Sequence, residues 1–517
     1  MADNSILELS IIETSHFKCY SERALEAGRH IFNSTLAYAL NNWNSMKQLS
    51  IYRLLLSEYT KAKNSKKKED KAYKECLALD LTELRYKYKL SKYQLESFAT
   101  DYKNNHGYDK YLDSNTILNI AGRVWDSISK IMFYKGKRVH FCKYGNFNTL
   151  EGKTNKQGIR FIKKGETLRN KKLDNHTVVW NGIRVLVKIR ENDIFAHEMI
   201  ATKKVKYCRL VRKLVKGKYK WYVQLVLEGA PCPKRNKDGS FRNKVSLGKR
   251  IGLDEGTTTL ATVSENSVSL EKLGNDEIDY LAKKINRLNR KLTRSRIKTN
   301  PENFNQDGTV KRGKKLTWVR SKNYMKTLFA LKECYRLKAV KLKLSHRILA
   351  NSILELGTEV YIEKMNFKAL AKKSKETVIS KKTNRIKSKK RFGSSITNYA
   401  PAMFQSILEQ KLKYLGLELH KVNTTTFKAS QYDHFKDRCI KKSLSSRWKY
   451  IDKYKIQRDL YSAFLLMNSD DSLKHTNRDF CIKTFNNFLK LHNEEIDRLK
   501  NTIDKLPTSF GIKQKIV

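Results

Sequence analysis

The stretch RIGLDEGTTTLATVSENSVSL, residues 250–270, holds the pattern that decides the fold of the C-terminal half of the chain. A short apolar run ends at Asp254, a turn follows at Gly256, and two more apolar segments span Thr258–Val263 and Val268–Leu270. Short apolar runs bounded by turn residues predict β-strands rather than helices. We therefore expect three consecutive strands here, the first of which ends in a carboxylate.

A second strand of the same kind, Val360–Glu363, also ends in a carboxylate. If this strand pairs in parallel with the one that ends at Asp254, both carboxylates lie at one edge of a sheet. A third carboxylate, Asp459, follows Ile456 by three residues on a predicted helix whose apolar stripe continues through Leu460. The three residues are therefore candidates for one shared site.

Clustered carboxylates point to Mg²⁺ chemistry. Two divalent ions about 3.5 to 4 Å apart can activate water and stabilise the leaving oxygen of a phosphodiester. Carboxylate oxygens are the side-chain ligands that suit Mg²⁺. Taken singly, each residue has an equally good structural role: Asp254 in a turn, Glu363 at the start of a loop, and Asp459 as a helix-start charge beside Arg458. Their order and settings favour the shared site.

Helices and basic segments separate these motifs. The predicted helix Leu281–Lys298 carries eight Lys or Arg and no acid, and helical periodicity resumes from Tyr324 to a stop at Gly357. Lys372–Arg391 carries ten basic residues and one acid, which is typical of a mobile loop over the site or over bound nucleic acid. An amphipathic helix then ends at Gly416, and a strand over Leu417–Val422 follows it.

The N-terminal half has a different texture. An alternating segment around Leu7–Ile12 predicts a strand that pairs with a distant partner, and residues 21–134 show helical periodicity. Residues 136–229 are β-like and end in CRLVRKLVKGKYKWYVQLVLEG, in which Lys216-Gly217-Lys218 predicts a hairpin turn. The segment 230–248 predicts a linker.

The charge of the chain points to a polyanionic partner. The formal net charge is +56, from 107 Lys and Arg against 51 Asp and Glu. Nucleic acid is the best candidate, because each phosphate that contacts Lys or Arg releases a condensed counterion. A membrane is disfavoured, since no apolar stretch approaches the span of a bilayer. The start MADNSILELS does not resemble a secretory signal, and eight scattered cysteines predict reduced thiols and a cytoplasmic protein.

Three motifs carry a family resemblance. IGLDEGTTTLATVS, VYIEKMNFKAL and QRDLYSAFL resemble the first, second and third RuvC motifs of the TnpB transposon nucleases and the compact type V CRISPR effectors. APAMFQSILEQKLKYLGLELHKVNTTTFKASQYDH resembles the family's helix and strand between the second and third motifs. The resemblance implies that Asp254, Glu363 and Asp459 are the catalytic residues and the ligands of two Mg²⁺ ions, with Asp254 bridging both.

The resemblance also implies an architecture. The fold class is α/β plus α-helical and β domains: an RNase H-like RuvC nuclease domain, a helical recognition domain and a β-barrel-like wedge domain. The expected boundaries are 1–20 for the first wedge strand, 21–135 for recognition, 136–245 for the wedge domain and linker, 246–423 for RuvC motifs I and II, 424–455 for a target-loading insert, and 456–517 for motif III and the C-terminal helices.

One departure from the family concerns zinc. Many members carry a four-cysteine zinc ribbon in the region equivalent to 428–455, where this chain offers only His434 and Cys439. A tetrahedral site needs four such ligands, so we predict no zinc. A small apolar cluster is expected to hold the region together instead, formed by Trp448, Tyr450, Ile451 and Tyr454, with stacking of surface aromatic residues on DNA as the alternative.

The expected function is RNA-guided cleavage of double-stranded DNA in a prokaryotic cytoplasm, associated with the nucleoid when bound, with a guide RNA supplying the sequence recognition. The alternatives are an RNA-guided DNA-binding repressor without cleavage and a DNA transposase. The origin of the guide, and whether one or two copies act on one guide, stay open. The expected nucleic-acid contacts are basic residues of the helix and of the loop: Lys283, Lys284, Arg287, Arg290, Lys291, Arg294 and Arg296, and Lys372, Lys373, Lys389, Lys390 and Arg391.

Overall fold

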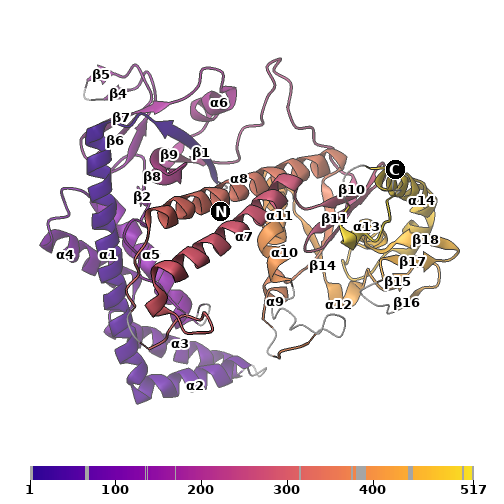
Figure 1. Cartoon of the computed structure of the whole chain (residues 1–517), viewed down its shortest axis with the longest axis horizontal. Coiled ribbons are helices and arrows are strands. Elements are labelled where there is room, and N and C mark those ends of the chain that lie inside the picture. The colour runs from indigo at the N-terminus through magenta and orange to yellow at the C-terminus, as the bar shows by residue number, and fades with distance from the viewer. Residues whose placement is uncertain are drawn as a thin grey trace. The chain divides into compact units, whose positions relative to one another are not determined.

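The computed structural model describes residues 4–64, 69–133, 136, 138–168, 170–313, 316–373, 376–379, 392–440, 446–502 and 506–514. The chain divides into two compact units, residues 1–232 and 233–517. Each unit combines helices with a β-sheet (Figure 1), which confirms the expected mixture of helical and sheet structure.

The N-terminal unit contains a seven-stranded sheet in the order β2-β8-β9-β1-β7-β6-β3. The first strand, β1 (Asn4–Ile11), lies antiparallel between β9 (Lys218–Glu228) and β7 (Ile183–Lys188), as the indigo arrow among magenta ones shows in Figure 1. The expected pairing of this strand with distant segments is thus confirmed. The other strands are β2 (Thr149–Glu151), β3 (Arg160–Ile162), β6 (Thr177–Trp180) and β8 (Val205–Val215), and a separate pair is formed by β4 (Thr167–Leu168) and β5 (Lys171–Lys172).

Residues 216 and 217 form the turn between β8 and β9, as predicted. Lys216 has φ +50° and Gly217 has φ +79°. Positive φ at both central residues defines the tight hairpin turn that matches the twist of antiparallel strands. The alternation of apolar residues along β9 then places Trp221, Val223 and Leu225 in the core.

Helices fill the rest of the N-terminal unit. The first of them begins earlier than predicted, because Thr14 accepts a hydrogen bond from the backbone N–H of Phe17 and so caps the helix at Ser15. The helices are α1 (Ser15–Gln48), α2 (Ser50–Asn64), α3 (Glu69–Lys87), α4 (Lys92–Asn105), α5 (Ser114–Met132) and α6 (Ile194–Thr202).

The C-terminal unit is built on a five-stranded sheet in the order β12-β11-β10-β13-β14. The first three strands are antiparallel neighbours, whereas β10, β13 and β14 run parallel to one another. The three consecutive strands and the parallel pairing predicted from the sequence are both confirmed. The strands are β10 (Arg250–Glu255), β11 (Thr259–Ser264), β12 (Val268–Lys272), β13 (Glu359–Glu363) and β14 (His420–Val422).

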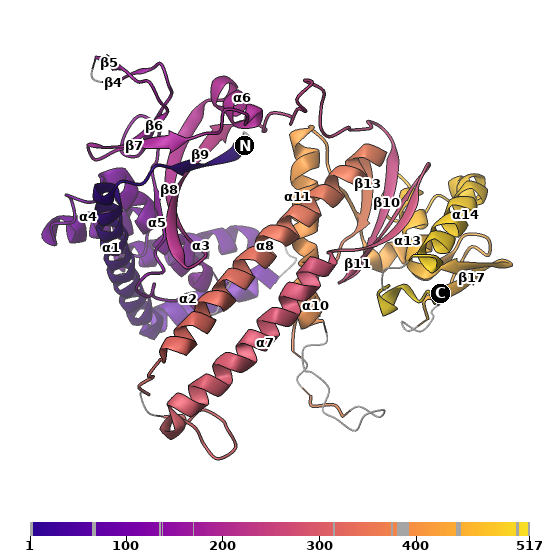
Figure 2. The same cartoon turned by 45° about the horizontal axis from the view of Figure 1, so that its top comes forward.

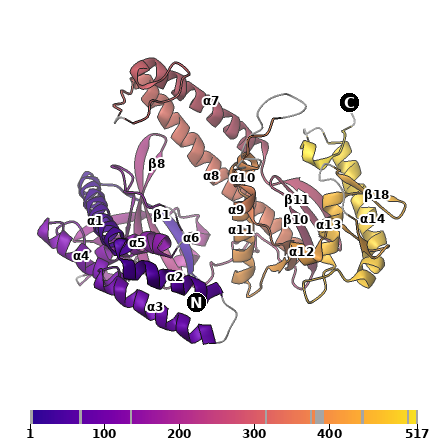
Figure 3. The same ribbon diagram turned by 90° about the horizontal axis from the view of Figure 1, so that it is seen from below.

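Two helix layers cover this sheet. On one face Ile251 and Leu253 pack against α8 (Lys322–Leu356) and α11 (Pro401–Tyr414). On the other face the sheet packs against α13 (Arg458–Met467) and α14 (Arg478–Lys500), and Figure 3 shows α13 beside β10 and β11.

A long helical hairpin extends from the sheet. It is formed by α7 (Asp276–Thr299) and α8, which lie side by side in Figure 2 and share an apolar seam that includes Leu281, Ile285 and Leu331. The remaining elements are short: the 3₁₀ helices Pro301–Asn303 and Thr508–Phe510, α9 (Phe367–Leu370), α10 (Gly393–Tyr399), α12 (Thr424–Phe427), β15 (Tyr432–Asp433), β16 (Arg438–Cys439), β17 (Trp448–Ile451) and β18 (Tyr454–Gln457).

Candidate active site

Strand register brings the first two carboxylates together. Leu253 of β10 pairs with Ile362 of β13 in the parallel ladder. Asp254 and Glu363 are the next residues on these two strands, so they stand beside each other at the carboxyl edge of the sheet. This is the arrangement that the two strand ends in the sequence predicted.

A close contact between α13 and β10 positions the third carboxylate, Asp459. A Cβ atom at Gly252 would lie 1.9 Å from the carbonyl oxygen of Ala463, so only glycine lets α13 approach β10 this closely. Asp254 lies two residues beyond Gly252 on the strand, and Asp459 lies four residues before Ala463 on the helix. Both steps advance about 6 Å, because a strand rises about 3.3 Å and a helix 1.5 Å per residue. The negative charge of Asp459 acts on Asp254, so the two steps lead to the same place.

The three carboxylates interact electrostatically. The pKa of Asp254 is raised well above its ordinary value, first by burial and then by the negative charges of Asp459 and Glu363, while Arg458 opposes the shift. Burial also raises the pKa of Glu363. Like charges held close together in a partly dry site favour protonation, or a bound cation that neutralises them.

Arginine and glutamine side chains surround Asp459. Arg458 approaches it at 3.0 Å through Nη2, and Arg447 approaches at 3.6 Å through Nη1. The side-chain amide of Gln457 donates to the same carboxylate at 3.4 Å. Asp459 is thus charge-paired, whereas the charged groups that shift the pKa of Asp254 are acidic apart from Arg458.

The donor set suits Mg²⁺ in one specific way. Among the residues that the structure describes, no three His, Cys, Asp or Glu side chains are gathered tightly enough to enclose a metal ion by themselves. Mg²⁺ commonly keeps several waters and is held by one or two carboxylates together with substrate phosphates. Asp254 with either neighbour fits that mode, so phosphate and water would complete the coordination.

A further buried carboxyl, which was not among the residues predicted from the sequence, lies next to the site. Glu255 follows the alternation of Ile251 and Leu253 and therefore points to the opposite face of the sheet from Asp254. One of its oxygens accepts a hydrogen bond from Gln405 at 2.6 Å, and the other has no partner among the described residues. Burial raises its pKa well above the ordinary value. Its period-two spacing from the two buried apolar residues is the signal that would have found it.

The basic residues predicted on α7 line its exposed side. Those at 283, 284, 287, 290, 291 and 294 are exposed, opposite the seam that contacts α8. None of these six forms a salt bridge within the described part of the chain. Arg296 differs, because its guanidinium lies 3.9 Å from the centre of the Trp318 ring and helps to pack the end of the hairpin. Lys372 and Lys373 are exposed after α9, whereas Lys389, Lys390 and Arg391 lie outside the described residues.

The segment expected to lack zinc is packed by aromatic residues. His434 is fully buried, its Nδ1 lies 2.7 Å from the Tyr461 hydroxyl, and its ring contacts Phe435 and Phe485. Burial lowers the pKa of His434 to about 4. Cys439 is exposed on β16. That the chain binds no zinc stays a prediction.

The β17–β18 hairpin carries the apolar cluster predicted there, with one correction. Ile451 is buried, and Trp448 and Tyr454 pack against the same core. Tyr450 is 63% exposed and does not belong to the cluster, because it lies on the opposite face of β17 from Ile451.

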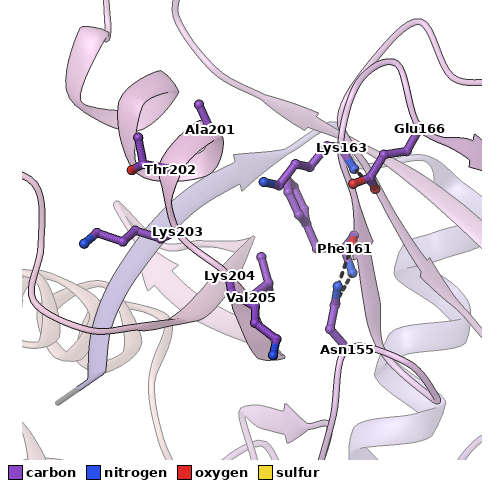
Figure 4. Close-up of a pocket in the computed structure, with 9 residues that line it drawn as sticks. All are labelled: Asn155, Phe161, Lys163, Glu166, Ala201, Thr202, Lys203, Lys204 and Val205. Carbon is purple, nitrogen blue, oxygen red and sulfur yellow. Dashed lines mark hydrogen bonds between the residues drawn. The ribbon is translucent and has the colours of Figure 1, made fainter. Parts of the chain in front are cut away.

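A separate hollow of about 390 Å³ lies in the N-terminal unit (Figure 4). Asn155 in its wall is fully engaged, since it accepts from and donates to the backbone of Phe161. Three lysines and one glutamate give the lining a net positive charge. The lining residues are Asn155, Phe161, Lys163, Glu166, Ala201, Thr202, Lys203, Lys204 and Val205.

Comparison with known proteins gives fold likenesses only. No family model matches the chain, and no curated protein matches it. Two solved structures are similar over 90% of this chain and 99% of theirs: a Cas12f1–sgRNA–target DNA complex, with 13% identity and a TM-score of 0.43, and a CRISPR–Cas12f ternary complex, with 14% identity and a TM-score of 0.26. In the described residues, no helix has the length and apolar character needed to span a membrane.

Proposed function

We propose that the protein is an RNA-guided DNA endonuclease of the compact type V kind, with an RNase H-like nuclease domain and a curled, barrel-like wedge sheet. The observation that carries the proposal is the placement of Asp254, Glu363 and Asp459 near one sheet edge, where burial first, and then the negative charges of Asp459 and Glu363, raise the pKa of Asp254. Carboxylates crowded together in a buried place repel one another, and such crowding is typical of a site that binds divalent cations.

Each side chain has a distinct part in the proposed reaction. Two Mg²⁺ ions would supply activated water and stabilise the leaving oxygen of the phosphodiester. Asp254, on which the charges of both other carboxylates act, would hold the ions together with Glu363 and Asp459. Arg458 and Arg447 place positive charge beside Asp459, where it would attract the phosphate backbone.

The exposed face of α7 would hold the backbone of bound nucleic acid. Its six exposed cations form no salt bridge within the described residues and follow one side of a continuous helix, which gives a row of charges along a phosphate backbone. Such contacts position a strand but read no sequence. Sequence recognition would come from a guide RNA that pairs with the target DNA strand.

A DNA-binding protein that does not cut is the second candidate. The observation that favours it is the pairing of Asp459 with Arg458 and Arg447, which neutralises one of the three carboxylates. A transposase with an Asp-Asp-Glu order is disfavoured, because here the glutamate stands on β13 and the last of the three carboxylates is an aspartate on α13.

One experiment separates these candidates. The RNA that copurifies with the protein is sequenced, and duplex DNA complementary to its guide segment is incubated with the complex in Mg²⁺ or in EDTA. The proposal expects cleavage in Mg²⁺ alone, and none by Asp254→Ala although that variant still binds the target. Target binding without cleavage by the wild-type complex would support the second candidate. Cleavage by Asp254→Ala would reject the site.

A further inference from the structure

Gln457 contacts both the Asp459 side chain and the start of the helix that carries it. Its side chain is completely buried, immediately before α13. Its Oε1 accepts the backbone N–H of Leu460 at 2.8 Å, which caps the helix that carries Asp459. Its Nε2 donates to Asp459 Oδ2 and to the carbonyl oxygen of Phe510, each at 3.4 Å. Both ends of one buried amide are therefore occupied, and one of its partners is the third carboxylate.

The backbone of Gln457 is fixed as well. Its N–H donates to Nε2 of His492 on α14 at 3.0 Å, and Nδ1 of His492 lies 3.0 Å from Asn493 Oδ1. An imidazole that accepts at Nε2 carries its proton on Nδ1, so the ring is neutral and its orientation is defined. Burial lowers the pKa of His492, in agreement with a neutral ring.

The C-terminal segment 506–514 contacts this residue. Phe510 is buried in the core beneath α13. The carbonyl oxygen of Phe510 accepts a hydrogen bond from the side-chain amide of Gln457. The carbonyl oxygen of Gly511 accepts one from the indole N–H of Trp448 at 2.8 Å. The segment thus fastens both β17 and the start of α13.

Gly511 adds a steric requirement. Its φ is +69°, and a Cβ atom there would lie 2.3 Å from Cβ of Arg447. The carbonyl oxygen of Arg447 in turn accepts the backbone N–H of Arg458 at 3.0 Å. A displacement of Arg447 would therefore also move Arg458, so both cationic neighbours of Asp459 would shift.

We infer that residues 506–511 act through Gln457 to orient Asp459, so that Gln457 is a positioning residue of the metal site. The inference rests on the proposed function. Partners that hydrogen-bond to a ligand from outside the first coordination sphere fix its direction, and their loss costs about 10- to 100-fold in metal affinity. Nothing in the local sequence around Asp459 reveals this arrangement, because Phe510 and His492 come from other parts of the chain.

Two variants and two matched controls test the inference. Gln457→Glu keeps an oxygen to cap α13 but replaces the donor to Asp459 by a second negative charge. Gln410→Glu makes the same charge change on the exposed surface of α11. Gly511→Ala pushes against Arg447, whereas Gly416→Ala places the same residue at φ +77° with nothing within 4 Å.

The measurements are Mn²⁺ binding to the guide-bound protein, by calorimetry, and target cleavage against metal concentration. For Gln457→Glu and Gly511→Ala we expect Mn²⁺ to bind about 10- to 100-fold more weakly, and cleavage to need correspondingly more metal, while both controls match the wild type. Guide and target binding should not change. If Gln457→Glu fails to fold, Gly511→Ala still decides whether the segment 506–511 acts on Asp459.

The possible failures are distinguishable. If the wild type binds Mn²⁺ and cleaves, and both variants do so with unchanged metal dependence, the role of Gln457 is wrong while the proposed function stands. If the wild type neither binds Mn²⁺ nor cleaves, the proposed function and the inference are both wrong. An equal loss in the variants and in the controls would show a general structural effect and would overturn the positioning role.

Discussion

Gly252 of β10 lies against the backbone of Ala463 in α13, so that a Cβ atom at Gly252 would stand 1.9 Å from the Ala463 carbonyl oxygen and 2.4 Å from the Met467 nitrogen. Both of these atoms belong to the backbone and cannot turn aside. The level of Asp459 relative to Asp254 thus depends on the absence of a side chain two residues before Asp254.

Gly252→Ala should therefore separate the carboxylates. The added methyl group must push α13 away from the sheet, which we expect to lower the free energy of unfolding by about 1–3 kcal/mol or more. Cleavage should fall further than target binding, because the displaced helix carries Asp459. Gly122→Ala in α5 serves as the control, since its new Cβ meets only the end of Lys92 at 3.8 Å. A Gly252→Ala protein with wild-type stability and cleavage would contradict this account of the site.

Asp254→Asn should stabilise the metal-free protein. The pKa of Asp254 is raised in the folded state, so folding favours its protonated form; this contribution is fully present below the ordinary carboxyl pKa of about 4 and is lost as the pH rises through the folded-state value. At pH 8 in EDTA the variant should be more stable than the wild type by about 1 kcal/mol or more. Chemical denaturation at pH 5 and pH 8 measures the difference.

Added Mg²⁺ should reverse that ranking. Mg²⁺ that binds the folded wild type should raise its melting temperature as the Mg²⁺ concentration increases. The melting temperature of Asp254→Asn should rise little. Equal stabilisation of both proteins by Mg²⁺ would mean that the ion binds elsewhere. Asn keeps the size of the side chain, so loss of packing does not confuse the comparison.

The sequence predicted the two strand ends and not what joins them to α13. Asp254 and Glu363 each close an apolar run, and that local pattern is enough to place them at one sheet edge. The position of Asp459 relative to Asp254 depends on the contact of Gly252 with α13, and its orientation depends on the hydrogen bond from Gln457. Both are contacts between residues far apart in the chain, which periodicity does not record. Tyr450 was misplaced for a related reason, since an apolar residue on a hairpin can face either side.

The basic side of α7 should govern the salt dependence of nucleic-acid binding. Replacement of Arg287, Arg290 and Arg294 by Gln removes three exposed cations while keeping good helix formers. Each lost phosphate contact should reduce the slope of log affinity against log salt by about 0.7–0.9, so the triple variant should lose up to about 2–3 in slope. Affinity measured at several salt concentrations gives this value.

Arg296→Gln is the matched comparison for that variant. Its guanidinium packs on Trp318, so its loss should lower the melting temperature and leave the salt slope nearly unchanged. If the triple variant binds with the wild-type slope, the exposed face of α7 does not contact phosphates.

His434 should make the aromatic core of the C-terminal unit sensitive to acid. Burial lowers its pKa to about 4, from an ordinary value near 6.5. The unfolded chain therefore takes up a proton that the folded chain rejects, and stability present above pH 6.5 is lost as the pH falls towards 4. His434→Phe removes this loss while keeping the contacts with Phe435 and Phe485. Between pH 7 and pH 4.5 the variant should lose about 1–3 kcal/mol less stability than the wild type, measured by urea denaturation.

Tyr461→Phe, which removes only the hydroxyl beside His434, should retain the acid sensitivity. An unchanged pH dependence in His434→Phe would show that other groups govern the acid response.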